Sequence, residues 1–355
     1  MKVTIKELAK HLDLSIATVS RALDGFPDIS DKTRARVLAA ALEMGYAPDR
    51  AARQLRRGRT DTIGFILPTV AARLPQPFFN ELIAGLADGA SRRQLDLLIS
   101  ACADGEEAEL QLYRSWVQGH RVDGLIVTRT HMVDRRVTFL LEQQFPCVCL
   151  EPPPGNPDAP GIRIPAREAL TSLVRHVATR GFRRLAFLGG AMELTIQRSR
   201  LKAFSAAVHK VGLQTNPNWQ VTSDMTSQGG YEITTRLLTS GDAPDCLVCV
   251  NDEVALGALH AAKDLGIPIG EQLAIVAFDG LTAAAYAAPQ LTTIDQPVIT
   301  LAHRLTELLH RQIQGESLQE RQIALQPVIH LRESTGDAQR EIAYPFVIDE
   351  LTEVT

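Results

Sequence analysis

The sequence lacks the long hydrophobic run that a membrane protein needs. None of its apolar stretches approaches the roughly 18–20 residues that cross a bilayer as a helix. The first residues, Met1 to Thr4, also lack the apolar core of a secretory signal peptide. We therefore expect a cytoplasmic protein without a membrane partner.

Cysteine is scarce, with 5 residues in a chain of 355. Cys246 and Cys249 have the C-x-x-C spacing of many zinc and redox sites, but they lie inside the apolar run 246–250. On a strand, side chains three positions apart point to opposite faces, and no second pair or His cluster is nearby. We expect buried, small hydrophobic side chains here and no metal; a zinc or redox site is the less favoured interpretation.

Recognisable catalytic motifs are missing too. The sequence contains no G-x-x-x-x-G-K-[ST] phosphate loop, no G-x-S-x-G nucleophile turn and no H-E-x-x-H zinc motif. Its 9 histidines are scattered, and none is paired with Cys or Asp at a useful spacing. The sequence therefore predicts a protein that is not an enzyme and needs no cofactor.

The sequence does have an ordinary globular composition and an uneven distribution of charge. Apolar residues make up 45% and charged residues 22%, and 355 residues suffice for about two or three domains. Residues 1–60 hold 12 Lys and Arg against 7 Asp and Glu, whereas the remainder holds 25 against 34. A basic head on an acidic body indicates that the head meets a polyanion.

Three short helices are predicted in residues 1–47. A capping box begins at Thr4, and Ser15 suits the N-cap of a second helix after a short turn. Such a pair of helices is a helix-turn-helix candidate, and Ser30 or Asp31 starts a third helix. The side chains expected to face inward are Ile5, Leu8, Ala9, Leu12, Val19, Ala22, Leu23, Val37, Leu38, Ala41 and Leu42.

The second helix has a face suited to the major groove of DNA. Its exposed side chains are short, which allows close approach to base edges, apart from one arginine that can bind guanine with two hydrogen bonds. A small helical packing domain with a solvated face is the alternative, because helix pairs are common. The residues of this face are Ser15, Ile16, Ala17, Thr18, Ser20 and Arg21.

A basic segment, Pro48 to Gly58, follows within a predicted linker of residues 48–60. Its four arginines repel one another, and a helix of about ten residues is shorter than the roughly 12–15 that are marginally stable in isolation. We expect the segment to become helical only when DNA phosphates neutralise it and a partner packs on it. A plain basic linker is the alternative.

The body alternates short apolar runs with helical stretches, which is the pattern of parallel sheets with crossover helices. Eight such units favour an α/β body of two doubly wound subdomains, and the Pro- and Gly-rich break at 152–165 disfavours an eight-stranded barrel. We place one subdomain at about 61–161 and 293–325, and the other at about 162–292 and 326–335. The expected strands are 62–67, 95–101, 124–128, 147–150, 185–188, 220–222, 247–250 and 273–278.

Polar residues follow several of these strands, where open α/β sheets bind ligands. Thr128 and Arg129 end one strand, and Asn251 and Asp279 end two others. Helix capping is the competing role for such residues, and for Asp252 it is the better interpretation. Further candidates are Arg200, and Phe78 and Phe79, which could stack on a sugar face or pack in the core.

The motifs of the head resemble those of a known family. The stretches VTIKELA (3–9), SIATVSRAL (15–23), TRARV (33–37) and GYAP (45–48) resemble, in order, the DNA-binding head of LacI-type transcriptional regulators. That resemblance implies base reading by Ile16, Ala17 and Arg21, phosphate contacts by Ser15, Thr18, Ser20, Ser30 and Thr33, and insertion of Leu55 into the minor groove. We add Thr4, Arg53 and Arg56 to the predicted DNA contacts.

The body resembles the effector domain of the same family, which is similar to periplasmic sugar-binding proteins. The motifs are QPFF (76–79), GLIV (124–127), NDEVALG (251–257) and LTTIDQP (291–297). The resemblance implies effector contacts at Phe78, Thr128, Arg200, Asn251, Asp279 and Gln296, to which we add Arg129.

The resemblance implies a repressor of a carbohydrate-utilisation operon, in which a sugar bound between the subdomains controls the affinity for double-stranded operator DNA. A purine, nucleoside or sugar phosphate effector is the alternative, and a solute-binding protein without a regulatory role is less favoured because of the basic head. Residues 336–355 contain no leucine heptads, so we expect a homodimer.

Replacing Leu55 by Ala is expected to weaken operator binding by roughly tenfold or more, because the kinked DNA loses the apolar wedge at its unstacked base step. Titration of the native and L55A proteins against operator and unrelated DNA at one salt concentration measures the effect. An unchanged preference for the operator would contradict the conditional-helix interpretation.

Overall fold

The computed structural model describes residues 3–24, 26–46, 58–68, 77–102, 105–213, 215–337 and 340–343. The chain divides into two compact units, Met1–Thr60 and Asp61–Thr355, at the point where the sequence placed the end of the linker. The predicted hinge contacts Arg53, Leu55 and Arg56 lie outside the described residues.

The head contains the three predicted helices, α1 (Ile5–Leu12), α2 (Ile16–Leu23) and α3 (Asp31–Glu43). The capping box is present: the Thr4 amide donates to the Glu7 carboxylate at 2.7 Å, and the Thr4 hydroxyl accepts from the Glu7 amide. Ser15 and Ser30 cap α2 and α3 in the same way, each accepting from the amide three residues later. These side chains satisfy amides that have no partner within their own helix.

A small apolar core joins the three helices of the head. The prediction that Leu38 and Leu42 face inward is wrong, because these side chains are 50% and 85% exposed. The buried stripe of α3 runs through Val37, Ala40 and Ala41 instead. The other two helices cover only this stripe, which leaves the two leucines, one turn apart, on the solvent side.

The body consists of two lobes, each built on its own sheet. The first, the N-lobe, has a six-stranded and entirely parallel sheet in the order β11-β5-β4-β3-β1-β2. Its β3 and β4 are buried along their whole length, as expected of strands that helices cover on both faces. The strands are β1 (Thr62–Pro68), β2 (Asp96–Cys102), β3 (Gly124–Val127), β4 (Cys147–Leu150), β5 (Gly161–Arg163) and β11 (Gln322–Ala324).

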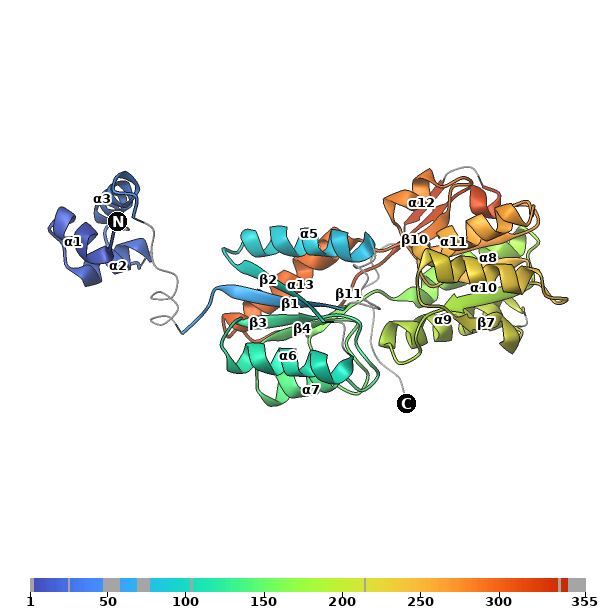
Figure 1. Cartoon of the computed structure of the whole chain (residues 1–355), viewed down its shortest axis with the longest axis horizontal. Coiled ribbons are helices and arrows are strands. Elements are labelled where there is room, and N and C mark those ends of the chain that lie inside the picture. Colours follow the sequence, from blue (N-terminus) through green and yellow to red (C-terminus); the bar gives the residue numbers. More distant parts are fainter. Residues whose placement is uncertain are drawn as a thin grey trace. The chain divides into compact units, whose positions relative to one another are not determined.

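Helices cover both faces of the N-lobe sheet (Figure 1). On one face α5 (Pro77–Ser91) packs beside α13 (Val298–Ile313), and on the other lie α6 (Glu106–Gln118) and α7 (Arg135–Glu142). Because α13 comes from far along the chain, the N-lobe core joins segments that are distant in the sequence.

The second lobe, the C-lobe, has a seven-stranded sheet in the order β13-β12-β10-β9-β8-β6-β7. Five strands are parallel, whereas β12 pairs antiparallel with β10 and the edge strand β13 pairs antiparallel with β12, so the sheet is mixed rather than purely parallel. The strand β13 lies in the segment that the sequence left as a tail. The strands are β6 (Leu185–Gly189), β7 (Gln220–Thr222), β8 (Cys246–Cys249), β9 (Ala274–Asp279), β10 (Thr292–Asp295), β12 (Val328–Leu331) and β13 (Arg340–Ala343).

The C-lobe sheet is also covered on both faces (Figure 1). One face carries α8 (Ala166–Thr179) and α9 (Thr195–Val211), and the other carries the remaining α-helices of the lobe. These are α10 (Ser227–Leu238), α11 (Asp252–Asp264) and α12 (Thr282–Tyr286), with short 3-10 turns at Pro217–Trp219 and Glu333–Thr335.

Three connections join the lobes, after β5, after β10 and between β11 and β12. The subdomain boundaries expected after residues 161 and 292 fall inside β5 and β10, because each strand pairs with the sheet that precedes the crossing. The two separate sheets exclude the barrel alternative. Among the described residues, no helix combines the length and the apolar composition that a membrane span requires.

The helices α5 and α13 approach closely because glycines face their contact. A Cβ atom on Gly85 would lie 2.6 Å from the Cβ of Ala302, well inside van der Waals contact. The absence of a side chain at this position therefore sets the distance between the two helices.

Replacing Gly85 by Ala is expected to lower the unfolding temperature of the protein. Overpacking costs about 1–3 kcal/mol, whereas the better helix propensity of Ala returns at most about 1 kcal/mol. Gly241→Ala is the matched control, because a Cβ atom there meets nothing within 4 Å. Thermal unfolding of the two variants at equal protein concentration measures the difference, and equal midpoints would contradict the packing argument.

Candidate functional site

The head presents hydroxyl groups at the N-termini of two helices. Ser15 Oγ lies 2.8 Å from Thr18 Oγ1 on α2, and Ser30 Oγ lies 2.9 Å from Thr33 Oγ1 on α3. Helix N-termini favour anions, because their first amides have no partner within the helix and the helix dipole is positive there. These four predicted phosphate contacts therefore lie where a phosphate would be stabilised.

Ile16, Ala17 and Arg21 share the exposed face of α2. Arg21 forms an ion pair with Asp28 at 2.8 Å, and its guanidinium lies 4.7 Å from the centroid of the Phe26 ring. The hydrogen bond from Arg21 lowers the pKa of Asp28. The guanidinium is thus held at the surface, and a base that binds it must replace Asp28.

Two other predicted DNA contacts of the head are placed differently. Thr4 is exposed, but its hydroxyl donates to Glu7 at 2.9 Å. The prediction that Ser20 lies on the exposed face is wrong, because only 5% of it is exposed. Since α2 packs against both α1 and α3, its buried side extends from Val19 to Ser20.

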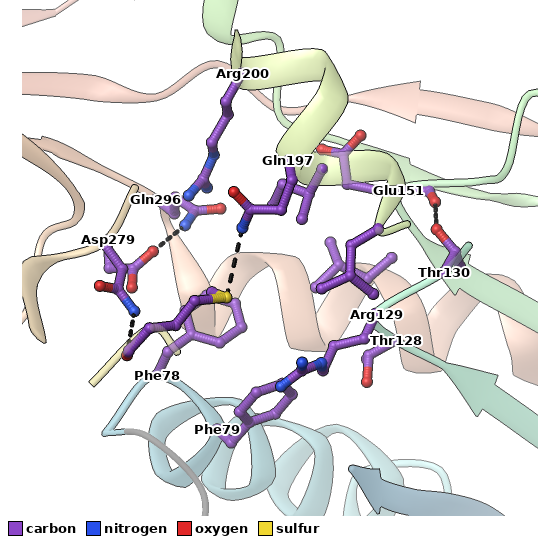
Figure 2. Close-up of a pocket in the computed structure, with 15 residues that line it drawn as sticks. Phe78, Phe79, Thr128, Arg129, Thr130, Glu151, Gln197, Arg200, Asp279 and Gln296 are labelled. Atoms are coloured by element: carbon purple, nitrogen blue, oxygen red, sulfur yellow. Dashed lines mark hydrogen bonds between the residues drawn. The ribbon is translucent and has the colours of Figure 1, made fainter. Parts of the chain in front are cut away.

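A pocket of about 610 Å³, part of which is open to solvent, lies between the two lobes (Figure 2). Its walls come from the start of α5, the start of α9 and the segments that follow β3, β4, β7, β8, β9 and β10. Both lobes thus contribute the carboxyl ends of parallel strands, where open α/β sheets bind ligands. The lining residues are Phe78, Phe79, Thr128, Arg129, Thr130, Leu150, Glu151, Leu194, Ile196, Gln197, Arg200, Met225, Asn251, Asp279 and Gln296.

All seven residues that the sequence suggested as effector contacts line this pocket. The sequence analysis missed Glu151, although it follows the apolar run 147–150 directly and has the same signal as Thr128. It also missed Gln197, for which no such signal exists, because only the tertiary fold brings the start of α9 to the pocket. The other lining residues it missed are Thr130, Leu150, Leu194 and Ile196.

A connected polar group forms the C-lobe wall of the pocket. Arg200 donates to the carbonyl of Val250 at 2.6 Å, and its guanidinium lies 4.2 Å from the centroid of the Phe278 ring. Gln296 Nε2 donates to Asp279 Oδ1 at 2.6 Å (Figure 2). These contacts fix the Arg200 guanidinium and the Asp279 carboxyl before any ligand arrives.

The structure assigns the capping role to Asn251 rather than to Asp252. Asn251 is the N-cap of α11, and its side-chain oxygen accepts from the amide of Val254 at 2.9 Å. Asp252 instead is buried and accepts from the Leu281 amide and the Thr293 hydroxyl. The capping role predicted for Asp252 is therefore wrong. Asn251 caps its helix and still lines the pocket, with its amide donating to the carbonyl of Met225.

Burial opposes the ionisation of both carboxyl groups in the pocket. It raises the pKa of Asp279 to about 7, although the nearby Arg200 and the hydrogen bond from Gln296 act in the opposite direction. Burial also raises the pKa of Glu151, whose Oε1 accepts from the amide of Ile164 at 2.8 Å. Perturbed carboxyl groups of this kind often mark functional sites.

Thr128 and Arg129 form the opposite, N-lobe wall just after β3. Arg129 has a φ of 48°, in the left-handed region that few non-glycine residues adopt. Burial lowers the pKa of its guanidinium. The Thr128 hydroxyl is buried and has no hydrogen-bond partner among the described residues.

The C-x-x-C cysteines lie on β8, where Cys246 and Cys249 are fully buried. Burial raises the pKa of both thiols, which keeps them protonated. In the part of the chain that the structure describes, no three His, Cys, Asp or Glu side chains are grouped as a metal site would require.

Comparison with known proteins agrees with this architecture. The family model for bacterial regulatory proteins of the lacI family matches residues 4–49, and that for a periplasmic binding protein-like domain matches residues 174–335. The transcriptional regulator AglR of Rhizobium meliloti (strain 1021) is 30% identical over 343 residues, which cover 95% of this chain and 96% of AglR. Catabolite control protein A of Priestia megaterium is 29% identical over 94% of this chain and 100% of its own length.

A solved structure of the lac repressor dimer, bound to operator and to an anti-inducer, has a TM-score of 0.83 with this structure. Its sequence is 24% identical and the match covers 94% of this chain and 99% of the repressor chain. The chain belongs to the LacI family of bacterial regulatory proteins. It is therefore a DNA-binding transcriptional regulator controlled by a small molecule, and its relatives are regulators rather than enzymes.

As pH rises from 5 to 8, the native protein should lose folding free energy that the variant Asp279→Asn does not lose, so the variant becomes more stable relative to the native protein. The folded carboxyl has a pKa of about 7, above its ordinary value of 3.8, so its contribution to stability is lost as pH rises through this range. Linkage gives a relative gain of about 2 kcal/mol for the variant over that interval. Thermal unfolding across pH measures it.

The exposed Asp264→Asn, outside the pocket, is the control for this experiment. If the difference in stability between Asp279→Asn and the native protein does not change with pH, the burial argument is contradicted.

Proposed function

We propose that this chain is a repressor of genes for carbohydrate use, and that its effector, a sugar or a sugar derivative, binds in the pocket between the lobes. The observation that carries the proposal is that all seven predicted effector contacts line one pocket. Phe78 and Phe79 offer ring surface for an apolar sugar face, and Asn251, Asp279 and Gln296 offer hydrogen bonds for hydroxyl groups.

The DNA side of the proposal rests on the head. Arg21 reads a guanine in the major groove, and Ile16 and Ala17 make apolar contacts with base edges. The hydroxyl groups at the starts of α2 and α3 hold phosphates. A dimer then places two heads on a pseudo-palindromic operator, and the lac repressor dimer bound to its operator supports this arrangement.

The coupling between the two sites follows from the walls of the pocket. Because both lobes line it, a ligand that prefers one angle between them biases that angle. In this proposal the segment that joins head and body transmits the bias, because Leu55 and its neighbouring arginines become helical over the minor groove in only one arrangement of the lobes. The effect on DNA affinity can be no larger than the differential affinity of the ligand for the two states, and such coupling is typically about 1–3 kcal/mol.

A purine or nucleoside is the second candidate effector. The rings of Phe78 and Phe79 meet edge to face with centroids 5.5 Å apart, and such a pair can stack on a nucleobase as well as on a sugar. Glucose, ribose and adenosine, compared as additives in thermal unfolding, separate the two classes of ligand, because binding to the folded state raises its stability.

Replacing Arg21 by Gln is expected to weaken specific binding by about 1–3 kcal/mol, roughly 5- to 150-fold, because a bidentate contact to guanine is lost. Binding to unrelated DNA should change far less. Lys10→Gln, an exposed charge on α1, is the matched control and should affect both DNAs equally. If Arg21→Gln lowers the affinity for operator and for unrelated DNA equally, Arg21 does not contribute to sequence specificity.

Footprinting of the operator with and without a ligand tests the coupling. A ligand that stabilises the protein should change operator affinity by about 5- to 150-fold, in either direction. A ligand that binds in the pocket and leaves operator affinity unchanged would contradict the proposed function.

A further inference from the structure

Buried arginines in the described part of the body have partners, whereas the half-buried Arg129 of the pocket does not. Arg136 forms ion pairs with Asp134 and Glu109, each at 2.6 Å, and Arg200 donates to a backbone carbonyl. The Arg129 side chain has no hydrogen bond or ion pair among the described residues, although it lines the pocket. Glu109 attracts it from a distance, but that carboxylate is already bound by Arg136.

The two carboxyl groups of the pocket do not neutralise Arg129. Figure 2 shows Asp279 across the pocket from Arg129, where it accepts a hydrogen bond from Gln296 and lies near Arg200. Glu151 accepts from a backbone amide, and burial opposes its ionisation. Among the described residues, the positive charge on the N-lobe wall of the pocket therefore has no carboxylate bound to it.

A ligand that fills the pocket removes the remaining water from this guanidinium. A buried charge needs a counter-charge as well as hydrogen bonds, and the hydroxyl groups of a neutral sugar supply only the hydrogen bonds. A carboxylate or phosphate supplies both, since its oxygens accept two parallel hydrogen bonds from a guanidinium. The Thr128 hydroxyl beside it is a further donor without a partner in the described part of the chain.

We propose that the effector is acidic: a small polyol with one carboxylate or phosphate group that binds to Arg129 and Thr128, while its hydroxyl groups bind to Asn251, Asp279 and Gln296. This inference rests on the proposed function, because it takes the interlobe pocket as the effector site. It makes Arg129 the residue that selects acidic over neutral ligands, and it assigns the opposite wall to recognition of the hydroxyl groups.

Matched ligands that differ in the acid group test the proposal. Glucose is the neutral reference, gluconate and glucuronate carry a carboxylate, and glucose 6-phosphate carries a phosphate. Calorimetric titration of the full chain should show about 10- to 100-fold tighter binding for at least one acidic ligand than for glucose. Whether a carboxylate or the phosphate binds best distinguishes the two sources of the acid group.

The variant Arg129→Met tests the residue itself. It keeps the length and apolar stem of the side chain and removes the charge, so it should abolish the preference for the acidic ligand over glucose. Arg92→Met, an exposed arginine of the same lobe outside the pocket, is the matched control and should keep the preference. The unfolding temperature of ligand-free Arg129→Met should be equal to or above that of the native protein, because the substitution removes no hydrogen bond or ion pair to a described residue.

Three results would overturn the inference: glucose binding as tightly as every acidic ligand, an acidic preference that survives Arg129→Met, or a lower unfolding temperature of that variant without ligand. Operator binding in the presence of each ligand separates this inference from the proposed function. If a neutral sugar binds and shifts operator affinity, only the inference of an acidic effector is contradicted. If an acidic ligand binds through Arg129 but leaves operator affinity unchanged, only the proposed regulatory role is contradicted.

Discussion

The three connections between the lobes are the constraint on which the rest of the body depends. They hold two doubly wound sheets so that the carboxyl ends of their parallel strands line one pocket. Residues as far apart in the sequence as Phe78 and Gln296 become neighbours there only because the chain passes between the lobes repeatedly. Any ligand in the pocket touches both lobes, which is the condition for converting ligand binding into a change of angle.

Charge in this pocket is arranged at a cost to the stability of the unliganded fold. Arg200 is fixed by a carbonyl and an aromatic ring, whereas burial opposes the ionisation of Asp279. Arg129 adds a strained backbone conformation and a guanidinium without an ion pair in the described chain. Sites that bind ligands commonly accept such local costs, because the ligand itself later satisfies the groups.

The head is stabilised by local interactions rather than by a large core. Its helices begin at capping side chains. The buried core that they enclose consists of alanine, valine and leucine side chains, half of them alanine. The same caps at Ser15 and Ser30 place hydroxyl groups at the helix N-termini, where a phosphate would lie. One set of short polar residues thus starts the helices and forms the face proposed to contact DNA.

The sequence by itself determined the helix caps of the head, eight of the strands and the polar residues at their ends, because each depends on neighbouring residues or on the end of a strand. It did not predict the strands β5, β10, β11, β12 and β13, and Gln296 came only from the family resemblance. Tertiary structure decided what depends on packing between distant segments. Leu42 has a helical period that suits a core, yet none of the described helices covers it, and Ser20 is polar, yet two helices bury it. Likewise, Asn251 rather than Asp252 became the cap, and Arg129 was left without an ion-pair partner among the described residues, because the positions of α11 and of the opposite lobe fix which groups meet.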